Sequence, residues 1–177
     1  MKKLAVILLA ILILPSCKKE KDPVWSGTVT INNILYGSGP YYAKGLSVKT
    51  GAIVSTLDGA EDVISVLADA NLDNTVRMVY MAVSNFENAF FKYGTYADAT
   101  AASAAFDGLT SFDQPAWEPW ATNLAANQVW LFRTSQDTYA KILVTAATGE
   151  KRDDKAFAEC TIKWVYQPDG TLTFPAK

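Results

Sequence analysis

From residue 24 onward, apolar and polar residues alternate with the two-residue period that is typical of half-buried β-strands. The alternation is most regular over residues 156–167. Several apolar residues share one face of this predicted strand: Ala158, Cys160, Ile162, Trp164 and Tyr166. Because its neighbours on that face are large and apolar, Cys160 is predicted to be a small core residue and not a reactive thiol.

Shorter apolar runs between turn residues predict the remaining strands. They cover residues 28–31, 46–49, 52–55, 63–67, 75–84, 128–134, 138–146 and 171–174. Gly51 predicts a hairpin between the second and third of these runs. Residues 75–84 are largely apolar on both faces, which predicts a central strand. Residues 110–127 are predicted to be irregular, and residues 148–155 to form a charged loop.

One helix is predicted in the middle of the chain. Asp98 can cap its N-terminus, an alanine-rich segment follows, and Gly108 can end it. Together these elements predict a mostly β fold class: two packed or strongly twisted antiparallel sheets, with one short helix near residues 98–107.

The start of the chain has a different pattern. Lys2 and Lys3 precede an unbroken apolar run over residues 4–14, and the sequence Leu-Pro-Ser-Cys at residues 14–17 ends it. This arrangement predicts a signal peptide over residues 1–16. A membrane-spanning helix needs about 20 apolar residues, so the run is too short to form one.

The end of this leader resembles the bacterial lipobox, in which diacylglycerol alkylates the cysteine and the chain is then cut just before it. The resemblance implies that Cys17 carries a lipid and anchors the chain to a membrane. Residues 17–23 would form a charged tether, and residues 24–177 a single β-rich domain. The expected location is the cell envelope, in the outer membrane of a Gram-negative bacterium, where an envelope protein could also be a partner.

Composition narrows the classes of function. The sequence contains no histidine, which excludes Ser-His-Asp and Cys-His nucleophile systems and every zinc site that uses histidine. Loss of the leader would leave 14 basic and 18 acidic residues, so nucleic acid is not an expected partner. With Cys17 lipidated, Cys160 is the remaining thiol, and no intramolecular disulfide is expected. We therefore expect a protein that is not an enzyme and has no metal site.

Two acidic patterns have simpler explanations than a functional site. Residues 69–74 have the D-x-N-x-D spacing that opens an EF-hand calcium loop, but Asn74 replaces its glycine and Tyr80 its bidentate glutamate. We interpret this segment as a polar turn. The adjacent acids Glu61–Asp62 and Asp153–Asp154 are interpreted as solvated surface, and not as the facing carboxylates of a glycosidase.

Several framework segments resemble one family of bacterial lipoproteins. Residues 128–134, 138–142 and 164–170 resemble the closing strands of HmuY-like lipoproteins, and residues 45–55 and 62–64 resemble their first hairpin. The family comprises outer-membrane haem-binding proteins of gut and oral anaerobes. The resemblance implies a fold of twisted antiparallel sheets and a ligand-binding role at the cell surface.

The same resemblance raises haem as a cofactor or ligand. The well-known members hold the haem iron between two histidines, whereas this chain has none. Met78 and Met81 are the thioethers that remain for such a role in the processed chain. Three residues apart on one regular strand, they point to opposite faces and cannot both bind one iron.

Aromatic residues in predicted loops suggest a second kind of ligand site. Trp117 and Trp120 could stack against sugar rings or a porphyrin, which predicts a carbohydrate- or glycan-binding accessory lipoprotein. Alternatively, they fold back and close the end of the sheets. Tyr41 and Tyr42 raise the same question. A third hypothesis is a structural or protein-interaction module without a small ligand.

Overall fold

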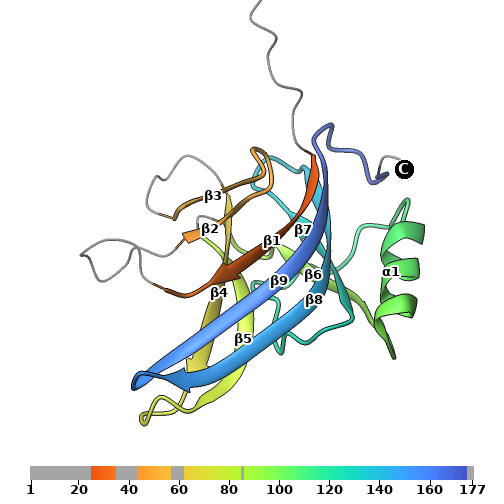
Figure 1. Cartoon of the computed structure of the whole chain (residues 1–177). Helices are drawn as coiled ribbons and strands as arrows, with labels where there is room; N and C mark the ends of the chain where they lie inside the picture. Colours follow the sequence, from red (N-terminus) through yellow and green to blue (C-terminus); the bar gives the residue numbers. More distant parts are fainter. Residues whose placement is uncertain (1–24, 35–43, 57–61, 85, 175–177) are drawn as a thin grey trace, which may run out of the picture.

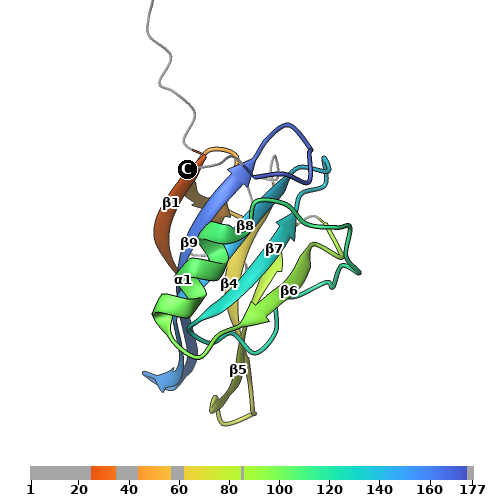
Figure 2. The same ribbon diagram turned by 90° about the vertical axis from the view of Figure 1, so that its right-hand side faces the viewer.

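The computed structural model describes residues 25–34, 44–56, 62–84 and 86–174 (Figure 1). These residues form two antiparallel sheets and one helix, so the predicted mostly β fold class is confirmed. The two sheets enclose the main core, and the helix covers the outer surface of the larger sheet (Figure 2). The described part of the chain therefore has three layers.

The larger sheet has five strands in the order β1-β9-β8-β7-β6. Their bounds are β1 (Ser26–Asn32), β6 (Phe90–Thr95), β7 (Gln128–Arg133), β8 (Tyr139–Arg152) and β9 (Lys155–Gln167). β7, β8 and β9 follow one another as antiparallel neighbours, and β1 pairs with β9 on the far side. This sheet supplies most of the surface on which both hydrophobic clusters are built.

The smaller sheet has four strands in the order β3-β2-β4-β5. Their bounds are β2 (Lys44–Ser47), β3 (Ala52–Ser55), β4 (Val63–Ala70) and β5 (Val76–Val83). Gly51 has a φ of 69°, a left-handed conformation that glycine adopts without strain. It lies in the turn that joins β2 to β3, so the predicted hairpin is confirmed.

The main core fills the space between the sheets. The predicted apolar face of β9 belongs to it in full: Ala158, Cys160, Ile162, Trp164 and Tyr166. Trp130 and Phe132 of β7 and Met81 of β5 pack with these residues and are also completely buried. Large aromatic side chains dominate the burial here, which explains how the core stabilises the fold without a disulfide.

A second cluster lies between the larger sheet and helix α1 (Ala99–Gly108). Asp98 caps the helix as predicted, because its Oδ1 accepts a hydrogen bond from the backbone N–H of Ala101 at 2.8 Å. At the other end, the buried Lys141 of β8 donates from Nζ to the carbonyl oxygens of Phe106 (2.7 Å) and Leu109 (2.9 Å). Both ends of the helix are thus satisfied by side chains.

The prediction that residues 75–84 form a central strand is wrong, because β5 is an edge strand of the smaller sheet. One face of β5 enters the main core through Val79 and Met81, whereas Tyr80 lies beside Trp120. The edge itself is paired at Met81 with the backbone of Ala121, by two hydrogen bonds of 3.0 Å. An edge strand that is covered on its outer face has apolar residues on both faces, as a central strand does, so the sequence does not distinguish the two.

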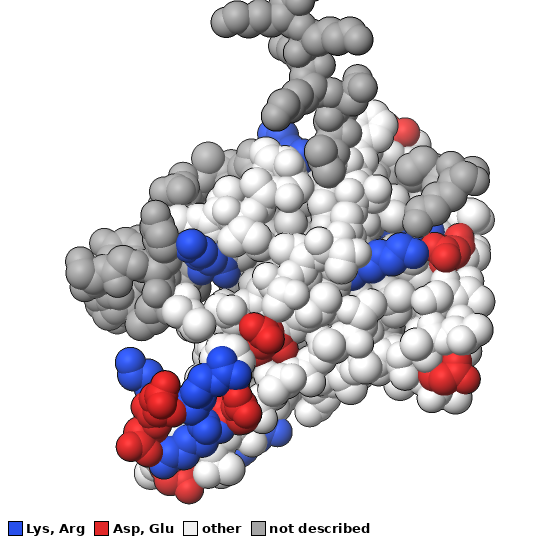
Figure 3. All heavy atoms as spheres, viewed as in Figure 1, with Lys and Arg blue, Asp and Glu red and all other residues white. Residues whose placement is uncertain are grey.

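The predicted charged loop over residues 148–155 is also wrong. β8 and β9 continue through it and turn at Asp153 and Asp154, whose φ angles of 48° and 56° suit a tight hairpin. Asn74, in the turn between β4 and β5, donates from Nδ2 to the carbonyl oxygen of Asp154 at 2.9 Å. Basic and acidic side chains gather where these two hairpins end (Figure 3). At the hairpin end of β8 and β9 both faces of the strands are exposed to solvent, so the sequence there lacks the alternation of apolar and polar residues that predicts a strand.

Two smaller elements also differ from the prediction. β6 was not predicted from the sequence, since its period is interrupted by a register shift between Lys92 and Gly94. The strand expected over residues 171–174 is instead a single bridge between Ser111 and Thr173.

Candidate functional site

The structure separates the predicted ligand-binding residues. Cys17, Tyr41 and Tyr42 lie outside the described residues. Met81 is completely buried in the main core, whereas Met78 lies on the opposite face of β5 and is partly exposed. The two methionines therefore do not converge on one ligand.

The two loop tryptophans have different environments. Trp117 is partly buried and stacks on Tyr139, with ring centroids 6.0 Å apart and an interplanar angle of 17°. Trp120 is 54% exposed, and its ring lies 6.2 Å from that of Tyr80. Trp117 therefore packs against the fold, as one interpretation predicted, whereas Trp120 is exposed at the surface.

Trp120 lies in a segment, residues 118–121, that joins the edges of the two sheets; we call it the edge bridge. Glu118 exchanges two backbone hydrogen bonds with Phe90 at the start of β6, of 2.7 and 2.9 Å. Three residues later, Ala121 pairs in the same way with Met81 of β5. Because both ends of the edge bridge are paired, the backbone of Trp120 is held between the edges of the two sheets.

A cleft of about 440 Å³ opens beside Trp120; we call it the Trp120 cleft. Its volume lies within the range of about 300–1,000 Å³ that is usual for small-ligand sites. It is lined by Val83, Ser84, Phe86, Glu87, Pro119 and Trp120. The cleft thus combines an open indole face and apolar side chains with a hydroxyl and a carboxylate, which can exchange hydrogen bonds with a polar ligand.

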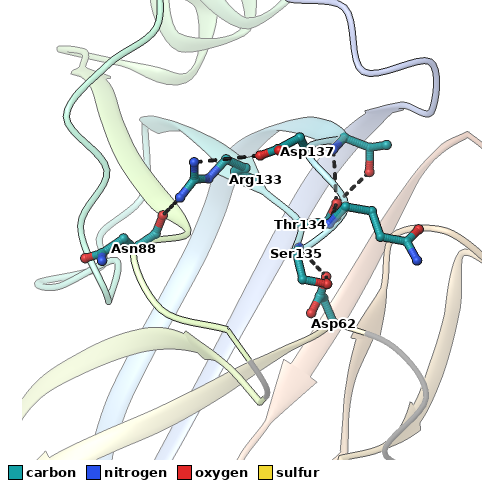
Figure 4. Close-up of polar contacts among 8 residues, drawn as sticks. Asp62, Asn88, Arg133, Thr134, Ser135 and Asp137 are labelled. Carbon is teal, nitrogen blue, oxygen red and sulfur yellow. Dashed lines mark hydrogen bonds and ion pairs between the residues drawn. The ribbon is translucent and has the colours of Figure 1, made fainter.

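Arg133, at the end of β7, contacts Phe86 of the cleft lining and forms polar contacts with Asn88 and Asp137 (Figure 4). Its Nη2 donates a hydrogen bond to the carbonyl oxygen of Asn88 at 3.1 Å. Its backbone N–H donates a hydrogen bond to the carbonyl oxygen of Ala89 at 2.7 Å. Its guanidinium carbon lies 5.0 Å from the ring centroid of Phe86 and 5.3 Å from that of Trp117. One side chain therefore contacts both the segment that lines the cleft and the residue that precedes the edge bridge.

Of the adjacent acids, Glu61 lies outside the described residues, while Asp62 and Asp154 form side-chain contacts. Oδ2 of Asp62 accepts hydrogen bonds from the N–H (2.6 Å) and the hydroxyl (2.8 Å) of Ser135, which joins β4 to the β7–β8 turn (Figure 4). Asp154 pairs with Lys151 at 3.0 Å. Asp62 therefore holds the β7–β8 turn beside β4, whereas the Asp154 side chain is 92% exposed and its ion pair is a surface contact.

The segment with calcium-loop spacing is the turn between β4 and β5. Asp73 accepts the backbone N–H of Thr75 at 3.0 Å, and hydrogen bonds from Thr75 hold the pKa of Asp73 below its usual value. Asp69 pairs with Arg77 at 2.5 Å. Among the described residues, no three cysteine or acidic side chains gather as a metal site would require.

A second cavity, of about 510 Å³, lies beside the β8–β9 hairpin. Its aromatic wall is Phe157, and the guanidinium carbon of Arg152 lies only 3.5 Å from the centre of that ring. Arg152 also pairs with Glu150 at 2.5 Å. Since a side chain of the protein already covers the aromatic face, this cavity offers a ligand less than the Trp120 cleft does.

Burial makes Cys160 unreactive. The thiol is completely buried in the main core, and burial raises its pKa to about 12. In a Cys17→Ser variant, where Cys160 is the only thiol, we expect no reaction with Ellman's reagent at pH 8 until guanidinium unfolds the chain. Prompt, stoichiometric labelling of the folded variant would contradict the placement of Cys160 in the core.

Sequence reasoning identified Trp120 but not Phe86, Glu87 or Arg133. No local pattern connects these residues with Trp120: long-range pairing of the edge bridge brings Phe86 and Glu87 to the cleft, and Arg133 reaches Phe86 and Trp117 from β7. Comparisons with protein-family models and with curated proteins found no match. The described residues include no helix with the length and apolar character needed to cross a membrane.

Proposed function

We propose that this protein is a lipid-anchored envelope protein without catalytic activity, and that it binds a glycan in the Trp120 cleft. The half-exposed Trp120 on the wall of that cleft is the observation that carries the proposal. Unlike a single exposed tryptophan, an exposed indole that lines a cleft with Val83, Phe86 and Pro119 is typical of a ligand site.

The chemistry of the cleft favours a sugar. One face of a pyranose ring presents C–H groups that stack on an indole, while its hydroxyls need hydrogen-bond partners. Trp120 can provide the stacking surface, and Ser84 and Glu87 can provide the partners. Pairing of the edge bridge at both ends orders the backbone that carries the indole before binding, which lowers the entropic cost of association.

Anchoring forms the second part of the proposal. The leader over residues 1–16 and the lipobox-like ending support lipidation of Cys17, with residues 17–23 as tether. An outer-membrane location and membership of the HmuY-like lipoproteins rest on the resemblance of the framework segments. In such a protein, the lipid provides attachment and the domain provides recognition.

Haem is the ligand that the resemblance implies, and the residues present suit it less well than they suit a glycan. The chain has no histidine, and Met81 is sealed in the main core. Haem would therefore have to bind without the paired ligands that the well-known family members use. We place a glycan first for this reason.

The proposal predicts that Trp120→Ala abolishes glycan binding. Removal of a central tryptophan usually costs about 2 kcal/mol or more, which is roughly a thirtyfold loss of affinity. The full chain, in mild detergent, would be run on native gels containing laminarin, hydroxyethylcellulose, mannan or glycol chitin. We expect at least one polysaccharide to retard the parent chain and to release the variant.

Trp25→Ala is the matched control, because Trp25 is 44% exposed and does not line the Trp120 cleft. It should migrate as the parent does. If none of the four gels retards the parent chain, the glycan proposal is wrong. A shifted Soret band on addition of haemin would then favour haem, and its absence a protein-interaction module.

A further inference from the structure

The walls of the Trp120 cleft come from two segments that are distant in the chain. Val83, Ser84, Phe86 and Glu87 form one wall, and the edge bridge forms the other. Affinity for a ligand between them depends on how far apart they are held. The backbone pairs of Met81 with Ala121 and of Phe90 with Glu118 hold the ends of both walls, so a contact behind the cleft can act on the side chains between these ends.

Arg133 makes contact on both sides. Its guanidinium lies 5.0 Å from the ring centroid of Phe86, which lines the first wall, and 5.3 Å from that of Trp117, which immediately precedes the edge bridge. Arg133 does not itself line the cleft. It can thus act on a ligand only through these neighbours.

Polar contacts keep the guanidinium in this position (Figure 4). It donates to the carbonyl oxygen of Asn88 at 3.1 Å, and its Nη1 lies 3.7 Å from Oδ1 of Asp137. Asn88 follows Glu87 in the chain, so the hydrogen bond ties the end of the first wall to β7. The planar guanidinium suits this place because it can stack on rings while it donates in its own plane.

The Arg133 side chain includes a buried donor without a hydrogen-bond partner in the described part of the chain, which is unfavourable for the stability of the fold. Among the described residues, Nε of Arg133 and Nε1 of Trp117 are buried without a hydrogen-bond partner. Unpaired buried donors destabilise a fold, and an apolar side chain of similar length would avoid one of them. Positioning of the walls explains what Arg133 contributes in return.

We infer that Arg133 is a positioning residue for the Trp120 cleft, which sets the distance between its two walls without touching the ligand. The inference rests on the proposed function of the cleft. It concerns the affinity of the site and not the existence of the fold.

The test compares Arg133→Met with Arg152→Met, in the full chain in mild detergent. Arg152 is a matched control, because it also covers an aromatic ring and pairs with a carboxylate, yet it lies at the other cavity. On the polysaccharide gel that retards the parent, we expect Arg133→Met to bind roughly tenfold more weakly, as after loss of one charge-assisted hydrogen bond. Arg152→Met should bind as the parent does.

A second readout does not need a ligand. With 5-fluorotryptophan incorporated, the chain has five fluorine signals, and Trp120→Phe identifies that of Trp120. We expect the Trp120 signal to shift or broaden in Arg133→Met and to stay unchanged in Arg152→Met. Arg133→Lys, which keeps the charge but not the planar fork, should lie between parent and Arg133→Met in both readouts, and it replaces Arg133→Met if that variant does not fold.

The outcomes separate the inference from the proposed function. If Trp120→Ala still binds every polysaccharide as the parent does, the proposed function is wrong. If Trp120→Ala loses binding while both Arg133 variants keep the parental affinity and the parental Trp120 signal, the inference alone is wrong. A lower urea midpoint with unchanged affinity would also assign Arg133 a structural role and overturn the inference.

Discussion

Replacement of Lys141 by alanine is expected to lower the free energy of unfolding by about 3 kcal/mol. Lys141 is only 4% exposed, and its Nζ donates to the carbonyl oxygens of Phe106 and Leu109 at 2.7 and 2.9 Å. Its loss leaves these buried acceptors at the helix C-terminus unpaired, at about 1–3 kcal/mol each, and opens a cavity under the helix. Release of the desolvated ammonium offsets part of this cost.

Lys163→Ala provides the control for this measurement. The Nζ atoms of both lysines lie 4.9 Å from the ring centroid of Phe106, but the Lys163 side chain is 30% exposed and pairs with Asp107 at 3.1 Å. Removal of such a half-exposed pair should cost less than about 1 kcal/mol. Urea unfolding at neutral pH compares the two variants directly. Equal midpoints would show that Lys141 does not hold the helix.

Gly45→Ala should destabilise the smaller sheet by about 3 kcal/mol. A methyl group at Gly45 would lie 2.4 Å from the carbonyl oxygen of Ile64 and 2.5 Å from Cγ1 of Val63. Gly45 is paired opposite Ser65 of β4, so the clashing carbonyl belongs to the neighbouring strand and cannot move without breaking the ladder. For a domain of this size, about 3 kcal/mol corresponds to a melting temperature roughly 6–12 °C lower.

Gly108→Ala tests the same chemical change where there is room for it. Apart from its chain neighbours and the backbone of its own helix, no heavy atom lies within 4 Å of the methyl group that would be added at Gly108, in the last position of α1. Because alanine favours a helix more than glycine does, we expect this variant to melt at the parental temperature or slightly above it. Thermal unfolding followed by far-ultraviolet circular dichroism measures both variants. A Gly45→Ala variant as stable as Gly108→Ala would contradict the described pairing of β2 with β4.

The sequence predicts those elements that a local rule controls. The alternation over residues 156–167 corresponds to β9, Asp98 caps α1, and Gly51 lies in the turn of the β2–β3 hairpin. Each of these depends on neighbours within a few positions in the chain. The prediction fails where contacts between distant residues determine the position of a strand. For β5, residues 118–121 pair with its edge and place Trp120 beside Tyr80 on its outer face, so an edge strand has the apolar pattern of a central one.

The candidate site shows the same limit. Trp120 can be singled out from its place in an irregular, aromatic segment, but the sequence cannot tell whether it or Trp117 remains open. Trp117 is covered because Tyr139 of β8, which is distant in the sequence, stacks on its ring. Likewise, no local pattern indicates that Arg133 meets both Phe86 and Trp117.

The pairing of β1 with β9 has a mechanical consequence. The two strands meet in seven consecutive antiparallel pairs, from Ser26–Val165 to Asn32–Glu159. If the chain is fastened through Cys17 as proposed, a pull from the membrane reaches the domain at Ser26. When the force acts along β1, it is shared by the hydrogen bonds of all seven residue pairs in shear. The pairs are then not broken one after another, as they would be if β1 were peeled away from β9. If the domain also binds a polymer as proposed, this geometry would resist unfolding when the polymer is pulled.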